Sequence, residues 1–480
     1  MKKKIQNIKG SMLVLVLVAT GLFSIMAMGA ISLALLQQKL NIKRVVSNQA
    51  LHVAEAGVNY YRWVLYHDAN EYCNKEACIS DPYGPYGPYN YTDSTGTIVG
   101  QYELYITPPP MNGSTVVDIK AVGWIASSPN IKRTIEVKCG IPSWSTYSTL
   151  CNSDIRFGSG TEVWGPIHSN GGIRFDGLAH NLISSSMLNY ADPDHQPSPN
   201  EFAVHTHLTP IDPLPDGNTP PLNVPIRNDV FMAGRAFPSP VVSFDLLDGH
   251  IYDIYSLATT SGIVLNPTGA EGYHIIISPN IGIANDQLDV YRINSITSTC
   301  SGRETFGINS ETFLNTYTVP ANGIVYVKDH LWIEGQINED RVTFLAFDDP
   351  ITGNTSNIIL NKNLIYTNYD GRDSIGLIAQ NNVLVGLYSN DNLNIDAALI
   401  AKEGRIGREY YSSFCNSTYY KRNSITIIGS LATEGRYGFA YTDGTGYQTR
   451  NLVYDNSLTF IPPPHFPTTG EYTFISWKEN

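Results

Sequence analysis

The feature that most constrains this chain is an uninterrupted apolar run near its N-terminus. No charged side chain occurs from Met12 to Leu36, where Leu, Val, Ile, Met, Phe and Ala are interrupted only by a few small residues. As an α-helix of about 25 residues the run is about 37 Å long, whereas the hydrocarbon core of a bilayer is about 30 Å thick. We therefore expect residues 12–36 to span a membrane.

The leader before this run, residues 1–10, carries charge of one sign. Its lysines are accompanied by no acid, which by the positive-inside rule places the N-terminus in the cytoplasm and the rest of the chain outside it. The run is too long for an ordinary cleaved secretory signal, and no small-x-small cleavage motif follows it. The sequence therefore predicts a single pass through the inner or cytoplasmic membrane.

The helix is expected to continue beyond the membrane. From Gln37 to His67 there is no proline, and apolar residues recur at nearly helical spacing. These residues are Leu40, Val45 or Val46, Leu51, Ala54, Val58, Tyr61 and Leu65. We predict one helix over 11–67, about 85 Å long.

A basic leader that ends in Gly10, directly before an apolar helix, resembles the signal of type IV pilins and pseudopilins. The stretch QALHVAEAGVNY at 49–60 is similar to the N-terminal family of PilX-like minor pilins. The resemblance implies that a prepilin peptidase cuts after Gly10 and leaves Ser11 as the first residue. It also implies that the helix leaves the membrane to join a pilus or pseudopilus, with the body displayed at the cell surface for adhesion.

The fifth position of the implied mature chain departs from this family. Major subunits usually carry Glu there, and this chain carries Leu15, which argues for a minor subunit. Other pilin subunits are the partners that the resemblance implies. Small residues in an apolar helix let neighbouring helices approach closely. The residues expected in such packing, beside Leu15, are Gly21, Gly29, Ala30 and Ala34.

The charge balance of the chain is acidic beyond the leader. The formal net charge of the chain is −12. Residues 1–44 contain no acid, so all the acidic residues lie in the remainder. A nucleic-acid-binding body would present a basic face instead, so no nucleic-acid partner is expected.

Six cysteines lie in the part expected outside the cytoplasm, where disulfides persist. Cys73 with Cys78 and Cys139 with Cys151 are suggested pairs, Cys300 and Cys415 remain, and fifteen pairings stay open. No C-x-x-C occurs, and the close histidine pair, His205 and His207, lies in a Pro-rich loop. We therefore expect no metal site and no cofactor.

Residues 68–142 are expected to form a pilin-like antiparallel β module. Its first part, 68–97, is rich in Pro, Gly and Tyr and is predicted to be a surface loop. Alternating strands follow at 102–106, 115–125 and 131–138. Three such strands form the smallest sheet that can cover the apolar stripe of the helix.

Residues 143–480 consist of short Val- and Ile-rich strands separated by Gly, Asn and Asp. Two pairs of segments look alike: IRFG at 155–158 with IRFDG at 173–177, and residues 395–407 with 425–438. Such repeats favour a right-handed parallel β-solenoid over a β-sandwich. The predicted fold class is thus mainly β, with one long N-terminal helix, a small antiparallel sheet and a β-solenoid.

Two segments interrupt the predicted solenoid. Residues 191–225 are Pro-rich and are expected to be an extended loop, and residues 243–260 are predicted to be an amphipathic helix that caps the open end. The domain resembles an uncharacterised β-helical domain that often follows PilX-like helices, which implies no known activity. The matching segments are 165–177, 375–386, 396–407 and 438–477.

Polysaccharide-cleaving enzymes with a parallel β-helix would place paired carboxylates, or an Arg with acids, on neighbouring rungs. The candidates are Glu162 with Asp176, Asp370 and Asp373 beside Arg372, and Glu403 or Glu434 before Arg405 and Arg436. Their spacing is that of turns, so we expect a ladder of salt bridges rather than an enzyme. The alternative that stays open is a membrane-anchored extracellular β-helix protein that binds or processes glycans.

Overall fold

The computed structural model describes residues 11–80, 83–244, 246–280, 285–348 and 356–480. These residues form two compact units. The helix unit comprises the chain up to Pro108, Val117–Cys139 and Phe474–Asn480. The body comprises Pro109–Val116 and Gly140–Thr473.

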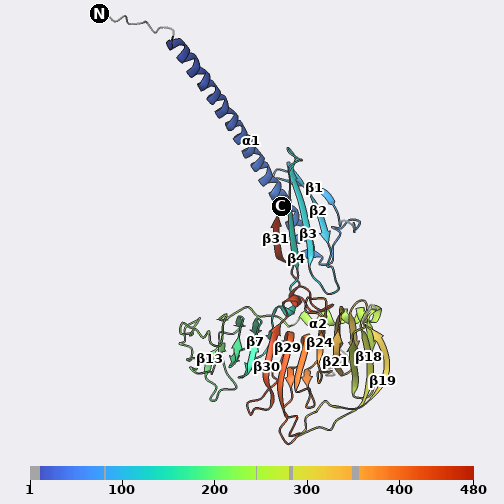
Figure 1. Ribbon diagram of the computed structural model, residues 1–480. Coiled ribbons are helices and arrows are strands. Elements are labelled where there is room, and N and C mark those ends of the chain that lie inside the picture. Colours follow the sequence, from blue (N-terminus) through green and yellow to red (C-terminus); the bar gives the residue numbers. More distant parts are fainter. Residues whose placement is uncertain (1–10, 81–82, 245, 281–284, 349–355) are drawn as a thin grey trace, which may run out of the picture. The chain divides into compact units, whose positions relative to one another are not determined.

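The helix unit is built on α1 (Ser11–His67), which covers the range that the sequence predicts. No proline or run of β-branched residues interrupts it, so nothing in the sequence breaks the hydrogen-bonded turns. Only its C-terminal half packs within the unit (Figure 1). The buried residues there are Val46, Ala50, Val53, Ala54, Val58, Tyr61, Val64 and Leu65.

A five-stranded sheet covers this half of α1, in the order β1-β2-β3-β4-β31 (Figure 1). The strands are β1 (Tyr86–Thr92), β2 (Ile98–Thr107), β3 (Val117–Ile125), β4 (Lys132–Gly140) and β31 (Thr473–Glu479). The neighbours from β1 to β4 are antiparallel. β2, β3 and β4 correspond to the three strands that alternation predicts.

The two outer strands were not predicted. β1 lies in the segment expected to be a loop, and it contains Pro88, which has no N–H to donate. Proline is tolerated in β1 because this is an edge strand. β31 comes from the end of the chain, so the predicted 143–480 domain is corrected: its last residues belong to the sheet of the helix unit.

Gly123 in β3 lets the sheet approach α1 closely. A Cβ at this position would lie 2.4 Å from the amide nitrogen of Ala54 and 2.6 Å from the carbonyl oxygen of Ala50, both in the backbone of α1. No side-chain rotation relieves contacts with backbone atoms. The packing of sheet on helix therefore requires a residue without a side chain here.

We expect Gly123→Val to separate the sheet from α1 and to lower the free energy of unfolding of the helix unit by about 1–3 kcal/mol, the usual cost of overpacking. Thermal unfolding of the full-length protein measures the loss. Gly29→Val is the matched control, because nothing lies within 4 Å of a Cβ at Gly29. Equal losses in both variants would contradict the role of Gly123.

The body consists mainly of short strands. Its first half contains the 3-10 helix η1 (Trp144–Thr146) and β5 (Thr149–Cys151), β6 (Ile155–Phe157), β7 (Thr161–Val163), β8 (Ile167–Ser169), β9 (Ile173–Phe175), β10 (Leu178–Ala179), β11 (Ile183–Ser185), β12 (Asn189–Ala191), β13 (Asn200–Phe202), β14 (Val204–His205) and β15 (Arg235–Ala236). The helix α2 (Leu246–Ser261) follows.

The second half of the body contains the longer strands. They are β16 (Ile263–Leu265), β17 (Gly272–Ser278), β18 (Gln287–Ile296), β19 (Ile308–Thr318), β20 (Ile324–Val327), β21 (Leu331–Ile337), β22 (Arg341–Ala346), β23 (Ile358–Ile359), β24 (Leu364–Tyr366), β25 (Ser374–Ala379), β26 (Val383–Val385), β27 (Asn392–Ala401), β28 (Ile406–Arg408), β29 (Lys421–Thr433) and β30 (Gly446–Tyr454), followed by the 3-10 helix η2 (Asn456–Thr459).

Parallel pairing stacks these strands so that like side chains lie beside one another. Both predicted repeats pair in parallel: β6 with β9, with Ile155 opposite Ile173, and β27 with β29, with Ile395 opposite Ile427. Inward residues of successive strands form continuous apolar columns in the core. One column consists of Leu364, Ile395, Ile427, Leu452, Val163 and Ala179.

The stacking does not follow the order of the chain. β29, near the end of the body, pairs in parallel with β5, near its beginning, with Leu431 opposite Thr149 and Thr433 opposite Cys151. β30 likewise pairs with β7. The first strands of the body thus continue a stack whose preceding members come from the end of the body.

Two predictions about interruptions are corrected. The segment 191–225 contains β13 and β14, and β14 extends a parallel ladder because Val204 lies opposite Ile173. The helix predicted at 243–260 is α2, Leu246–Ser261. Its residues Ile251, Ile254 and Ala258 share a core cluster with the outward residues Ile324 and Tyr326 of β20, and α2 also contacts β16. The helix therefore lies against an outward side of the stack rather than over its open rung.

Candidate functional site

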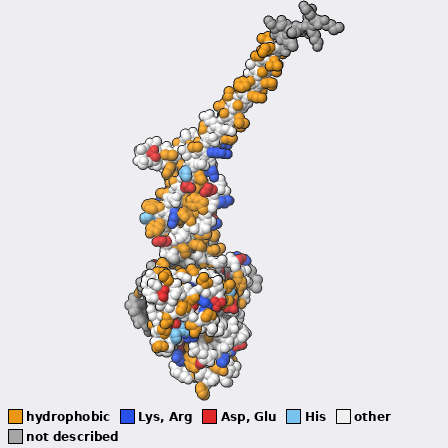
Figure 2. Space-filling model, turned by 90° about the vertical axis from the view of Figure 1, so that its left-hand side faces the viewer, with side chains coloured by type: hydrophobic (Ala, Val, Ile, Leu, Met, Phe, Trp, Pro, Cys, Tyr) orange, Lys and Arg blue, Asp and Glu red, His pale blue; other side chains and the backbone are white. Residues whose placement is uncertain are grey.

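The N-terminal half of α1 presents apolar side chains that no other described residue covers. Over the described residues, one helix is long and apolar enough to cross a membrane, and none of the most apolar part of α1 is buried. Figure 2 shows these hydrophobic side chains along the helix. Removing such a surface from water requires lipid or another protein.

The predicted site residues all belong to this helix or lie just before it. Gly10 is outside the described residues, and Ser11 is the first residue of α1. Leu15 is 68% exposed. The space where a side chain would stand at Gly21 or Gly29 is open, and Ala30 and Ala34 are exposed. These positions are therefore free to meet a partner.

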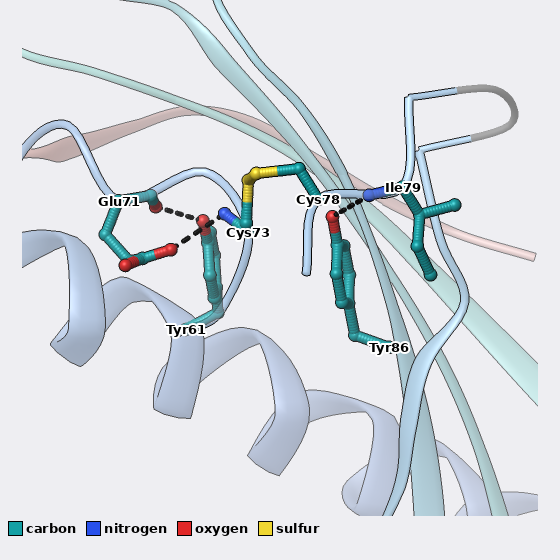
Figure 3. The surroundings of a disulfide bond; sticks show 6 residues. All are labelled: Tyr61, Glu71, Cys73, Cys78, Ile79 and Tyr86. Carbon is teal, nitrogen blue, oxygen red and sulfur yellow. Dashed lines mark hydrogen bonds between the residues drawn. A yellow bond between two sulfur atoms is a disulfide. The ribbon is translucent and has the colours of Figure 1, made fainter. Parts of the chain in front are cut away.

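The Cys73–Cys78 disulfide closes a small loop beside α1 (Figure 3). The Tyr61 hydroxyl, from α1, donates to the backbone carbonyl of Glu71, whose side chain accepts from the amide of Cys73 at 2.8 Å. On the other side of the disulfide, the amide of Ile79 donates to the Tyr86 hydroxyl at 2.9 Å. The loop thereby ties the end of α1 to β1.

Of the other four cysteines, two form a disulfide and two are free thiols. Cys300 and Cys415 form a second disulfide in the body. Cys139 and Cys151 are buried free thiols, one in each compact unit, so the suggested pair between them does not form in the structure. Burial raises the pKa of the Cys139 thiol to about 12, which keeps it protonated and unreactive at neutral pH.

The carboxylates that suggested glycan chemistry are engaged within the body. Asp176 pairs with Arg174 at 2.8 Å, and Asp373 accepts from the amides of Thr367 and Asn368 at 2.9 and 2.7 Å. Asp370 pairs with Arg372 in an exposed turn.

The predicted ladder of salt bridges is wrong. Glu403 pairs with Lys402, and Glu434 accepts from the side-chain amide of Asn152. Arg436 pairs instead with Asp194, and Arg405 donates to backbone carbonyls.

A surface pocket of about 490 Å³ lies beside β17, β19 and β21 and was not predicted from the sequence. His274 stands between two carboxylates, with Nδ1 2.8 Å from Glu311 and Nε2 3.0 Å from Glu334. Burial by itself lowers the pKa of His274, but hydrogen bonds to Glu334 and Glu311 outweigh it and raise the pKa. Trp332 and Lys362 also line the pocket. No local sequence motif predicts this site, because His274, Glu311 and Glu334 come from three separate strands.

Comparison with known proteins finds matches among solved structures. No family model and no curated protein matches the chain. Among solved structures, it is similar to the competence-associated pilin ComZ from Thermus thermophilus. The alignment covers 91% of this chain and 97% of that chain, with 12% identity and a TM-score of 0.33.

Proposed function

We propose that this chain is a minor type IV pilin-like subunit, related to the PilX-like group, that is exported, inserted in the membrane and then joins or primes a pilus or pseudopilus. The observation that supports the proposal is the difference between the two halves of α1. Its N-terminal half is uncovered and apolar, whereas Val53, Val58 and Tyr61 in its C-terminal half are covered by the sheet of the same chain. Such a helix can first pack against lipid in the membrane and later against the helices of other subunits in the pilus.

The same proposal places the N-terminus in the cytoplasm, where a prepilin peptidase would cut after Gly10. The lysines of the leader support this orientation. Leu15, where a Glu would pair with a neighbouring amino terminus, supports a role in low copy number.

The body is proposed to be a right-handed parallel β-solenoid that is displayed for surface contact and has no enzymatic role. Support for the solenoid comes from the parallel ladders and the in-register apolar columns. Support for contact with a ligand comes from the pocket around His274, which combines charged, amide and aromatic groups.

Gly10→Val is expected to abolish cleavage, because a bulky side chain at the junction would block the peptidase. Mass spectrometry of membrane-extracted protein measures the result. The unaltered chain should begin at Ser11, and the variant should retain Met1 and fail to reach the pilus fraction of sheared cells.

Gly29→Val is the matched control for processing. This variant should be cleaved normally but should assemble poorly, because the added side chain stands where a neighbouring helix would pack. If the unaltered protein retains Met1, or if Gly10→Val assembles as well as the unaltered chain, the pilin-like proposal fails. An anchored extracellular protein that binds or processes glycans would then be favoured.

A further inference from the structure

Four potential metal ligands converge in the first half of the body. Asp192 follows β12, Glu201 belongs to β13, His205 ends β14, and His207 lies two residues further along. One ligand atom from each lies within 4.8 Å of the others. Asp192, Glu201 and His205 are buried, and His207 is partly buried. Imidazoles and carboxylates that meet in this way form the donor set of many transition-metal sites.

The hydrogen bonding of His205 indicates which nitrogen faces the cluster. Its Nδ1 lies 3.0 Å from the carbonyl oxygen of Phe202, and a carbonyl can only accept, so Nδ1 carries a proton. In the neutral imidazole, Nε2 is then bare. It lies 3.1 Å from Oε2 of Glu201 and 3.6 Å from Oδ2 of Asp192.

In this tautomer the lone pair of Nε2 points at lone pairs of the two carboxylate oxygens inside the protein. Nε2 of His205 and Oε2 of Glu201 are both buried without a hydrogen-bond partner, and their side chains are 1% and 5% exposed. Unpartnered buried polar atoms are costly. Either a second proton on His205 or a bound cation removes the repulsion.

A second imidazole and a second carboxylate complete the cluster. Arg174 lies 2.8 Å from Asp176 and 3.4 Å from Asp192, so it pairs with both carboxylates. Nε2 of His207 lies 2.9 Å from Oε1 of Glu201. Two carboxylates thus face two imidazole nitrogens.

We propose that Asp192, Glu201, His205 and His207 bind one divalent transition-metal ion of the zinc type. Two nitrogen and two carboxylate-oxygen donors suit tetrahedral zinc, whereas magnesium and calcium prefer oxygen alone. The bond from Nδ1 of His205 to a backbone carbonyl is the outer support that orients a ligating imidazole. His195, with Nδ1 3.1 Å from Glu201 and a side chain 37% exposed, lies at the rim.

The ion would fasten the Pro-rich segment to the stack. All four ligands fall between residues 192 and 207, and β14 within this stretch pairs with β9. A metal here holds the β12–β13 hairpin and the following chain against that ladder. The site is independent of the assembly role proposed for α1, and it reverses the expectation that the sequence alone supports no metal.

Isothermal titration of the full-length protein in detergent, stripped with EDTA and titrated with zinc chloride, tests the proposal. We expect one equivalent to bind and to raise the thermal midpoint. His205→Ala and His207→Ala should each weaken zinc binding at least about a hundredfold. Cobalt in place of zinc should give the visible absorption of a four-coordinate ion in the unaltered protein only.

His274→Ala is the matched control, because His274 also stands between two carboxylates, Glu311 and Glu334. It should bind zinc like the unaltered protein. If His205→Ala does not fold, His207→Ala and Glu201→Gln carry the test, since His207 is nearer the surface and Gln keeps the shape of Glu. Absence of stoichiometric binding, or equal binding by the ligand variants, would overturn the proposal and leave His205 as a protonated ion-pair partner.

Discussion

Replacing Cys300 and Cys415 by serine together is expected to lower the free energy of unfolding of the body by about 5 kcal/mol in the chain-entropy account of disulfides. The two residues are 115 positions apart in the sequence, so their bond restricts a very large loop of the unfolded chain. In the folded body the flanking loops also meet through Arg303 and Glu409, at 2.6 Å, and through the Tyr411 hydroxyl and the Glu304 carbonyl. Thermal unfolding of the full-length protein by circular dichroism measures the loss.

Cys73→Ser with Cys78→Ser is the matched control. This pair is separated by only 5 positions, for which the same account gives about 2 kcal/mol. Because this disulfide lies in the helix unit, its loss should leave the unfolding of the body unchanged. An equal effect of both double variants on the body would show that loop length does not govern the stabilisation.

Phe344→Ala is expected to destabilise the body by about 3–5 kcal/mol, the usual cost of removing a fully buried aromatic ring. Phe344 is completely buried in β22, where it lies opposite Val325 of β20 and Leu377 of β25. Close packing on both sides leaves little freedom for the neighbours to fill the cavity. Chemical denaturation followed by circular dichroism measures the difference.

Phe414→Ala removes the same ring from a position that is 97% exposed, and it should change the free energy of unfolding by less than about 0.5 kcal/mol. A small effect at Phe344, comparable with that at Phe414, would mean that the inward columns of the stack are loosely packed. It would also weaken the proposal of a β-solenoid, whose stability depends on contacts between neighbouring strands.

Local patterns in the sequence were sufficient for several elements. The range of α1 follows from an absence of proline and an apolar periodicity, and both act within a few residues. β2, β3 and β4 follow from alternation, because one face of each strand is buried on α1. The pairing of Ile155 with Ile173 follows from two nearly identical segments.

Other features could not be predicted from local patterns, because they depend on contacts between distant parts of the chain. The short Ile- and Val-rich strands resemble one another, so each could pair with several others. No local sequence pattern therefore indicates that Leu431 lies opposite Thr149. The choice of Cys415 as the partner of Cys300 depends on the same long-range stacking.

The amino-acid sequence by itself thus determined the long helix, its apolar N-terminal half and the three central strands of the sheet on the other half, because these depend on near neighbours and on the polarity of side chains. Only the tertiary structure decided which strands stack, where the last strand returns and how Asp192 and Glu201 meet His205. The physical reason is that strand pairing and ligand convergence depend on which distant surfaces bury each other, and many alternatives share the same local pattern.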